Sequence, residues 1–291
     1  MPTRFEVDIE EVEYLRHGGK GYLARVFKPR GKGPFPMVMD IHGGAWVDGH
    51  RAQNDSINRP VAEGGVVVVS IDFRCPPEAT YPASVADVNY GIRWLKSQAA
   101  RFNSHPDRVG VMGTSSGGHL AVLAAMKPND PRYCAVPLPA APQLDAKVRY
   151  VVTLWPVICP LGRYKDHTAR PVGDPAYQGR GDAAQRQLRY WLTEDAMAEG
   201  SPNLALQRGD KIALPNILYL QSPLDVMHPR QCLDEFVAGY RKAGGDVQLE
   251  LYEGKPYDLI RSQPDSETAR TQVRKMIDFI HKHAASSPVA A

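Results

Sequence analysis

Residues 113–118 read Gly-Thr-Ser-Ser-Gly-Gly, and this stretch limits the possible folds more than any other part of the chain. It follows an apolar run that contains Val109 and Val111 and precedes an apolar stretch with helical character. A strand that turns into a helix this sharply needs glycines, because a Cβ at Gly113 or Gly117 would collide with the neighbouring strand or helix. The segment therefore predicts a tight strand-to-helix turn at the carboxyl edge of a parallel sheet.

The rest of the chain supports this architecture. Short apolar runs alternate with helical patterns, which favours parallel strands joined by crossover helices. The run Val66–Ile71 is almost wholly β-branched, as expected of a strand that is covered on both faces. We predict an opening antiparallel strand pair at 5–14 and 22–28, further strands at 35–41, 66–71, 108–112, 148–155, 216–221 and 247–252, and helices at 81–100, 117–126, 192–199 and 268–283.

One connection between predicted strands is much longer than the others. The 291 residues are expected to form a single domain, 1–291, in which residues 159–212 separate two strands. Connections of this length are usually lids or binding loops, and this one carries Tyr164, Tyr177, Tyr190 and Trp191. We interpret it as an inserted lid, with a surface excursion that has its own small core as the alternative. The last residues, 284–291, are small and apolar and are predicted to be a disordered tail.

Composition excludes several classes of function. The net charge is only +3 and the basic residues are scattered, which argues against a nucleic-acid partner. The start of the chain is too polar for a signal peptide, and no apolar run approaches the roughly 18 residues that span a bilayer, so no membrane partner is expected. The cysteines form no C-x-x-C pair, which disfavours a zinc site and fits reduced thiols in the cytoplasm. They are Cys75, Cys134, Cys159 and Cys232.

The pattern G-x-S-x-G centred on Ser115 is typical of a nucleophile elbow. The turn pushes the serine Oγ out at the sheet edge, and the following helix places its free N–H groups beneath the reacting carbon. A glycine-rich strand-to-helix turn without catalytic function is the alternative. The surrounding pattern, a strand before and a helix after, favours the elbow.

A second glycine motif, at residues 42–46, reads His-Gly-Gly-Ala-Trp and follows another predicted strand. Two adjacent glycines let the backbone approach a substrate oxygen closely. We predict that the N–H groups of Gly43, Gly44 and Ser116 form an oxyanion hole, in which the loss of one donor typically costs about 3 kcal/mol of transition-state stabilisation. His42 is expected to bond within its own loop, and His119 to be a packed helix residue.

These motifs resemble the α/β-hydrolase esterases of the hormone-sensitive-lipase and acetyl-esterase type, with the kynurenine formamidases as similar relatives. The resemblance covers roughly residues 20–280 and implies an α/β-hydrolase fold, with a mostly parallel central sheet, helices on both faces and a lid. The segment before His42 is short for the hormone-sensitive-lipase branch, whose members usually carry an N-terminal cap. Besides the two glycine motifs, the resemblance rests on Asp72-Phe73-Arg74, Pro77-Glu78, Tyr81-Pro82-Ala83 and Asp87-Val88.

The triad order of this fold is Ser, then Asp or Glu, then His. Asp225 follows a predicted strand at the position of the family's acid, although an ordinary loop or N-cap aspartate would look the same. The family's histidine slot after the last strand holds Tyr257 instead, and a tyrosine hydroxyl with a pKa near 10 is a poor base. His228, three residues after Asp225, is the nearest substitute, unless it is only a loop histidine near the site.

The sequence thus predicts serine-dependent hydrolysis of a small carboxylic ester through an acyl-enzyme, with an atypical or missing triad histidine. The substrate is a small molecule, no metal or organic cofactor is implied because protein groups suffice, and a homodimer is left open. Trp46 and the lid aromatics suggest a partly apolar substrate pocket. Two alternatives remain: lyase or isomerase chemistry that uses the oxyanion hole and Tyr257 as a proton donor, or a non-catalytic binding protein.

Overall fold

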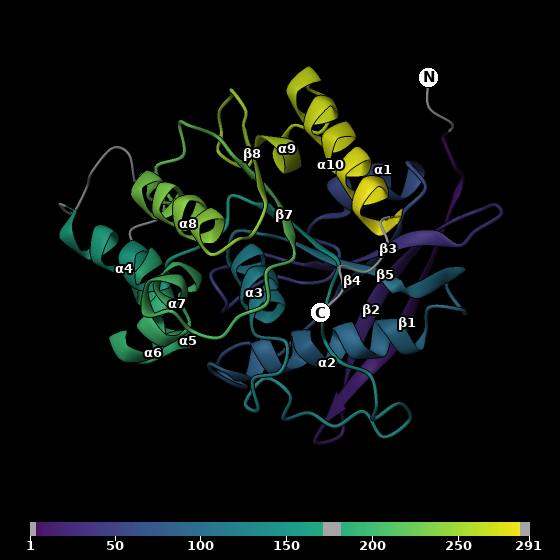
Figure 1. The fold of residues 1–291 in the computed structure, drawn as a ribbon, viewed down its shortest axis with the longest axis horizontal. Coiled ribbons are helices and arrows are strands. Elements are labelled where there is room, and N and C mark those ends of the chain that lie inside the picture. The colour runs from purple at the N-terminus through teal and green to yellow at the C-terminus, as the bar shows by residue number, and fades with distance from the viewer. Residues whose placement is uncertain (1–3, 171–181, 286–291) are drawn as a thin grey trace.

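The computed structural model describes residues 4–170 and 182–285 of the chain. Within them, strands form an eight-stranded sheet of order β1-β2-β4-β3-β5-β6-β7-β8 (Figure 1). The pairs β1/β2 and β2/β4 are antiparallel, and every other neighbouring pair is parallel. The strands are β1 (Val7–His17), β2 (Lys20–Pro29), β3 (Phe35–Ile41), β4 (Val67–Ile71), β5 (Ser104–Thr114), β6 (Tyr150–Leu154), β7 (Asn216–Gln221) and β8 (Val247–Leu251).

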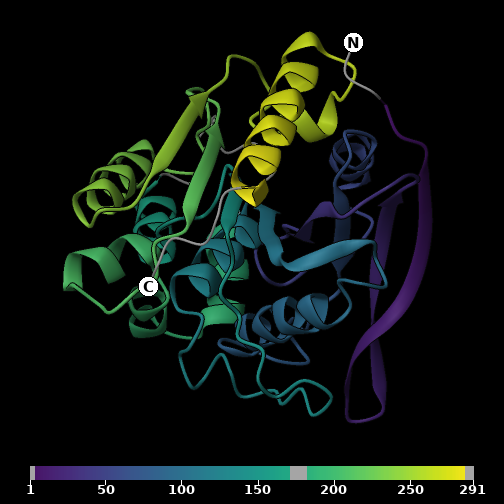
Figure 2. The same ribbon diagram turned by 45° about the vertical axis from the view of Figure 1, so that its right-hand side comes forward.

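Helices cover both faces of this sheet (Figures 1 and 2). One face packs against α2 (Ala83–Ser97), α3 (Ser116–Met126) and α8 (Arg230–Lys242), and the other against α1 (Asp55–Glu63), α9 (Leu259–Ser262) and α10 (Glu267–Ala285). The strand side chains alternate between these layers: Val67 and Val69 join the first core, whereas Val68 joins the second. The predicted α/β-hydrolase architecture, a mostly parallel sheet with helices on both faces, is confirmed.

The long connection between β6 and β7 contains α4 (Pro160–Ala169), α5 (Ala183–Trp191), α6 (Glu194–Glu199) and α7 (Pro202–Arg208). The helix predicted at 192–199 corresponds to α6, but its predicted start is wrong because α6 begins at Glu194. Leu192 has a φ of +64° and ends α5, and the Thr193 side chain accepts a hydrogen bond from the Ala196 N–H at 3.1 Å, which starts α6 afresh. Tyr177 of the predicted lid lies outside the described residues.

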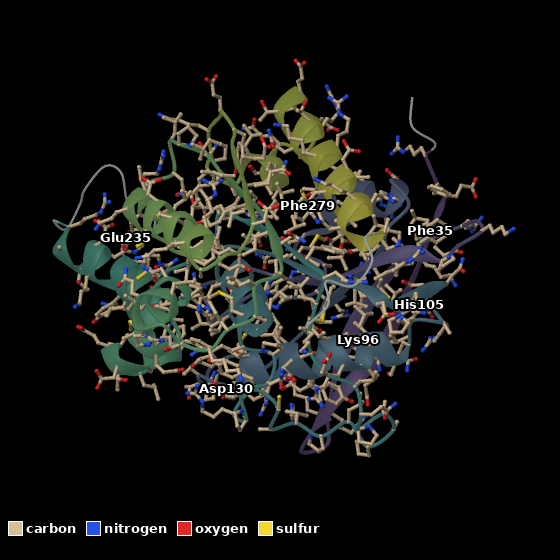
Figure 3. All side chains as sticks on the ribbon, viewed as in Figure 1. Phe35, Lys96, His105, Asp130, Glu235 and Phe279 are labelled. Atoms are coloured by element: carbon tan, nitrogen blue, oxygen red, sulfur yellow. The ribbon has the colours of Figure 1, made fainter. Side chains whose placement is uncertain are left out.

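The surface is polar, and Figure 3 shows side chains with charged ends along the outline of the molecule. No helix in the described ranges is both long enough and apolar enough to cross a bilayer. The predicted cytoplasmic location stays a prediction. In the predicted tail, Ala284 and Ala285 complete α10, and the remaining residues lie outside the part of the chain that the structure describes.

Candidate active site

The turn between β5 and α3 exposes Ser115 in a conformation that is unusual for a residue with a side chain. Its φ is +52° and its ψ is −119°. A Cβ on Gly113 would lie 2.6 Å from the backbone of Gly117, and a Cβ on Gly117 would lie 2.1 Å from the Ile41 carbonyl oxygen. Both glycines are therefore required by backbone contacts, as the sequence predicts for a nucleophile elbow.

The loop after β3 packs directly against this elbow. A Cβ built on Gly43 would lie 3.4 Å from the Ser115 Cβ. His42 stabilises this loop through two contacts. Its Nδ1 donates to the Gly43 carbonyl oxygen at 2.8 Å, and its ring stacks on Phe73 with centroids 4.3 Å apart. Burial lowers the pKa of His42 to about 4, so the ring is neutral at pH 7. The family-like Asp72-Phe73-Arg74 stretch thus supports the loop, since Arg51 also pairs with Asp72 at 2.7 Å.

The predicted oxyanion donors lie on these two adjoining turns. Gly44 has a φ of +117°, and a Cβ there would lie 2.0 Å from the Asp48 carbonyl oxygen, so only glycine fits. Within the described ranges, the N–H groups of Gly43, Gly44 and Ser116 donate no hydrogen bond. Three amide donors beside one nucleophile are the arrangement that an oxyanion hole requires.

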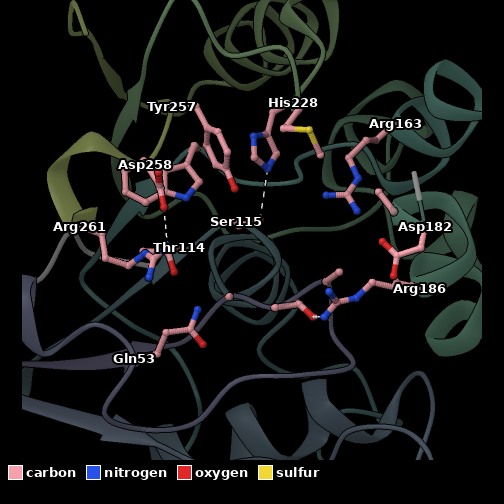
Figure 4. Close-up of a pocket in the computed structure, with 16 residues that line it drawn as sticks. Gln53, Thr114, Ser115, Arg163, Asp182, Arg186, His228, Tyr257, Asp258 and Arg261 are labelled. Carbon is pink, nitrogen blue, oxygen red and sulfur yellow. Dashed lines mark hydrogen bonds and ion pairs between the residues drawn. The ribbon is translucent and has the colours of Figure 1, made fainter. Parts of the chain in front are cut away.

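The loop after β7 brings His228 (Figure 4) and a carboxylate, Asp225, to Ser115. His228 Nε2 lies 3.2 Å from Ser115 Oγ, and its Nδ1 lies 2.7 Å from Asp225 Oδ2. Because the carboxylate accepts a hydrogen bond from the Nδ1–H, the proton of the neutral ring stays on Nδ1, and Nε2 is left as an acceptor for the serine hydroxyl. The side chains of Asp225 and His228 are 0% and 4% exposed, so this chain of hydrogen bonds is shielded from water.

Local hydrogen bonds explain why a histidine so close to Asp225 in sequence reaches both partners. The second carboxylate oxygen, Asp225 Oδ1, accepts the N–H groups of Met227 and His228 at 2.8 and 3.2 Å. This Asx-type turn folds the chain back, so that the His228 ring reaches the carboxylate of Asp225. From the end of β7, Gln221 Nε2 donates to the His228 carbonyl oxygen at 3.1 Å and fixes the loop.

Ser115 and His228 open into a pocket of about 300 Å³. Tyr257 lines it and packs its ring against His228, with centroids 5.5 Å apart. Tyr257 therefore lies beside the base candidate, near the serine, as expected from its slot after the last strand. Three arginines that the sequence analysis did not identify also line the pocket: Arg163, Arg186 and Arg261.

Trp46 does not line this pocket, and the prediction that it contacts substrate is wrong. Its side chain is 1% exposed and stacks on Tyr190, with centroids 5.6 Å apart, in a cluster that includes Trp191. The indole Nε1 donates to His119 Nδ1 at 3.1 Å. These aromatic residues thus anchor the β6–β7 connection to the core, and the pocket is lined by other apolar residues, such as Trp155 and Met227, together with charged ones.

His119 takes a structural part in this cluster. Its Nε2 donates to the Gly200 carbonyl oxygen at 2.8 Å while its Nδ1 accepts from Trp46, so the neutral ring satisfies both contacts. Burial lowers the pKa of His119 to about 4. In residues 4–170 and 182–285, no group of three or more His, Cys, Asp or Glu side chains is arranged to hold a metal ion.

Comparison with known sequences identifies esterase relatives. The BD-FAE family model matches residues 25–159. The probable carboxylic ester hydrolase LipM of Mycobacterium tuberculosis is 35% identical over 126 residues, which are 43% of this chain and 28% of LipM. The probable isoprenylcysteine alpha-carbonyl methylesterase ICMEL1 of Arabidopsis thaliana is 34% identical over 237 residues, which are 80% of this chain and 47% of ICMEL1. The chain thus spans less than two thirds of the length of these relatives.

Solved structures share the whole fold at lower identity. An esterase of Pyrobaculum calidifontis has a TM-score of 0.76 and 24% identity, over 96% of this chain and 86% of that one. EstE1, a thermophilic carboxylesterase from a metagenomic library, has a TM-score of 0.76 and 21% identity, over 97% and 92% of the two chains. These solved structures share the α/β-hydrolase fold with this chain, and the sequence relatives that it resembles are named as esterases.

Proposed function

We propose that this protein hydrolyses a carboxylic ester, with Ser115 as nucleophile and His228 as general base. The observation that carries the proposal is the hydrogen-bonded chain from Ser115 Oγ through His228 to Asp225, with distances of 3.2 and 2.7 Å, beside the glycine loop. The esterase names of the relatives support the same class of reaction. The atypical element is the position of the base, which follows β7 instead of β8.

Acylation follows from the geometry. His228 Nε2 accepts the proton of Ser115 Oγ as the oxygen attacks the ester carbonyl, and the N–H groups of Gly43, Gly44 and Ser116 stabilise the negative charge on the carbonyl oxygen. Asp225 holds the Nδ1–H and stabilises the imidazolium that forms. The imidazolium then protonates the leaving alcohol, and the acyl group stays on Ser115.

Deacylation uses the same groups with water as nucleophile. His228 takes a proton from water as the water attacks the acyl-enzyme, and returns it to Ser115 Oγ when the acid leaves. These steps need only protein groups and water. The described parts of the β6–β7 connection contribute to the pocket in this scheme, because Arg163 of α4 and Ala183 and Arg186 of α5 line it.

Labelling with a fluorophosphonate, followed by intact-mass measurement, tests the nucleophile. The wild type should gain one label, Ser115→Ala none, and His228→Ala should react about 100-fold or more slowly, since a positioned base typically contributes that much. Turnover of p-nitrophenyl acetate should fall in the same order. A folded wild type with an unreactive serine would refute hydrolysis and favour the Tyr257-dependent lyase or isomerase reaction, or a binding protein.

A further inference from the structure

Two buried thiols meet where the beginnings of α4 and α8 come together (Figure 1). Cys159 directly precedes α4, and Cys232 lies in the first turn of α8. A Cβ built on Gly162 would lie 2.9 Å from each of the two sulfurs, so both Sγ atoms face the same point of α4. Both cysteines are free, and neither takes part in the proposed hydrolysis. They form a dithiol that the ester chemistry leaves unused.

Cys159 has the surroundings of a reactive thiolate. It is the N-cap of the ten-residue helix α4, and its Sγ accepts the Gly162 N–H at 3.2 Å. The N-terminus of a helix stabilises a negative charge on such a sulfur. A hydrogen bond from the Cys232 thiol, and then the one from Gly162, lower the pKa of the Cys159 thiol below its usual value, although burial opposes them. Cys159 is therefore the nucleophile of the pair.

Cys232 is the complementary partner. Its hydrogen bond to Cys159 and its burial raise the pKa of the Cys232 thiol above its usual value, so this sulfur keeps its proton at neutral pH. A thiolate with a second thiol beside it is the arrangement found in redox-sensing cysteine pairs, in which the second thiol resolves the oxidised first one.

A small cavity reaches both cysteines. Its volume is about 10 Å³, and Cys159, Cys232, His228 and Pro229 contribute to its lining. A space of this size holds about one water molecule, so a bulky oxidant such as oxidised glutathione does not fit. Hydrogen peroxide is not much larger than water and is the oxidant that suits this site. The same cavity places the dithiol next to the proposed base.

Oxidation by peroxide proceeds in two steps. The Cys159 thiolate attacks one peroxide oxygen, the O–O bond breaks, and the released hydroxide takes up the proton that the thiol had lost. The sulfur, oxidised by two electrons, is then a sulfenic acid. Cys232 Sγ attacks this sulfur, the S–S bond forms as the S–O bond breaks, and the Cys232 proton leaves with the hydroxyl group as water. One peroxide thus becomes two water molecules, and two thiols become one disulfide.

The disulfide acts on the loop that holds His228. The Cys232 N–H donates to the Pro229 carbonyl oxygen at 3.0 Å, and Pro229 directly follows His228. Bonded sulfurs lie about 2 Å apart, whereas unbonded atoms stay about 3.5 Å or more apart. Bond formation therefore draws the first turn of α8 toward α4 and shifts His228 from its 3.2 Å contact with Ser115 Oγ. A misplacement of 1 Å at a catalytic group can cost about 100-fold in rate.

We propose that Cys159 and Cys232 form a peroxide-sensitive dithiol, and that the disulfide between them slows hydrolysis at Ser115. The effect on hydrolysis rests on the proposed function, whereas the formation of the disulfide does not.

Peptide mass mapping tests the disulfide. The reduced wild type is treated with graded hydrogen peroxide, denatured, alkylated with N-ethylmaleimide and digested. We expect a peptide pair joined through Cys159 and Cys232, which dithiothreitol separates, at peroxide concentrations that leave Cys134 free for alkylation. Cys134 is the internal control because its side chain is exposed, so accessibility alone would favour its oxidation. In Cys232→Ser, dimedone should trap a sulfenic acid at Cys159.

Turnover of p-nitrophenyl acetate measures the effect on the site. Oxidation should lower kcat of the wild type by at least about tenfold, and dithiothreitol should restore it. Cys159→Ser and Cys232→Ser should not respond to the same peroxide treatment, whereas Cys134→Ser should respond as the wild type does. Met227 lines the active-site pocket, and its oxidation to the sulfoxide would persist in dithiothreitol. A loss of turnover that both cysteine variants still show would therefore contradict the role of the disulfide.

Two further results would overturn the inference: Cys159 and Cys232 that both remain alkylatable at peroxide concentrations that oxidise Cys134, or a disulfide that forms while turnover stays unchanged. The mapping uses the wild type and does not depend on the folding of a variant. Failure of the underlying function looks different. In that case the reduced wild type hydrolyses the ester no faster than Ser115→Ala, the fluorophosphonate does not label it, and the mapping alone confirms or refutes the dithiol.

Discussion

Asp225→Asn is the change that most directly tests how His228 works. The two carboxylate oxygens have different partners: Oδ1 accepts the Met227 and His228 N–H groups, and Oδ2 accepts the His228 Nδ1–H at 2.7 Å. In the variant, the amide oxygen retains the two backbone bonds, so the amide NH₂ takes the place of Oδ2. A donor then faces Nδ1, and the ring must switch to the tautomer that carries its proton on Nε2.

The size of the effect follows from this switch. With a proton on Nε2, the ring presents a donor to Ser115 Oγ across the 3.2 Å contact and cannot accept the serine proton. The same substitution in the trypsin triad lowers kcat about 10⁴-fold, which corresponds to about 5.4 kcal/mol of activation free energy. We expect a loss of this order. The stability of the fold should fall by only about 1 kcal/mol, because the amide retains the backbone bonds and loses one charge-assisted bond.

Pre-steady-state hydrolysis of p-nitrophenyl acetate measures the acylation rate directly, and urea unfolding measures stability. Asp234→Asn is the matched control, since it makes the same chemical change at a 53% exposed carboxylate on α8 that pairs with Arg230. The control should acylate at the wild-type rate. If Asp225→Asn acylates within tenfold of the wild type, then Asp225 does not set the tautomer of the base, and the role given to the pair is wrong.

Three further predictions concern the elbow, the buried cluster and the tyrosine. Gly117→Ala should prevent soluble expression or lower the free energy of unfolding by several kcal/mol, because its Cβ would lie 2.1 Å from the Ile41 carbonyl oxygen; normal stability in urea would contradict this. Burial lowers the pKa of His119 to about 4, so its contribution to stability is complete above about pH 6.5 and is lost as pH falls toward 4. The wild type should therefore lose about 2 kcal/mol more than His119→Gln between pH 7 and pH 5 in urea unfolding; equal losses would show that His119 is not buried in the neutral form. Tyr257→Phe should retain p-nitrophenyl acetate turnover within about threefold, since no proton is routed through its hydroxyl; abolished turnover would favour the proton-donor alternative.

The strands and the elbow were predictable because their signals are local. The β-branched run of β4 predicts a buried strand, and β4 is buried along its whole length. Gly113 and Gly117 predict a tight turn, and a Cβ at either position would clash with backbone atoms. Six helices of the described residues were not predicted: α1, α4, α5, α7, α8 and α9. In α1, Pro60 inside the helix removes a backbone donor and disguises the helical pattern. In α8, the spacing of the buried residues Leu233, Phe236, Val237 and Tyr240 is amphipathic and is a sequence signal for this helix.

The pocket wall was harder to predict because it depends on tertiary packing. Arg163 and Arg186 lie on separate helices of the β6–β7 connection, and no spacing in the sequence shows that both face Ser115. The predicted substrate contact of Trp46 is wrong for the same reason, because the direction of its side chain depends on tertiary packing. An aromatic residue next to an oxyanion glycine looks like a substrate contact, whereas its ring turns inward to stack on Tyr190.

The proposed role of His228 as the base can be related to the connectivity of the sheet. Strands β7 and β8 are parallel neighbours, with Gln221 opposite Leu251, so the loops that follow them leave the sheet at the same edge. Either loop therefore brings a side chain near Ser115, and the chemistry depends on where the imidazole lies, independent of which strand precedes it. A histidine after β7 works only if its short tether to Asp225 bends back, and the bonds from the Met227 and His228 N–H groups to Oδ1 supply that bend. Because the proposed base lies in this loop, the slot after β8 can hold Tyr257, whose ring packs against the imidazole with centroids 5.5 Å apart. In the proposed mechanism, the base thus follows β7 instead of β8, and its Nε2 still lies 3.2 Å from Ser115 Oγ.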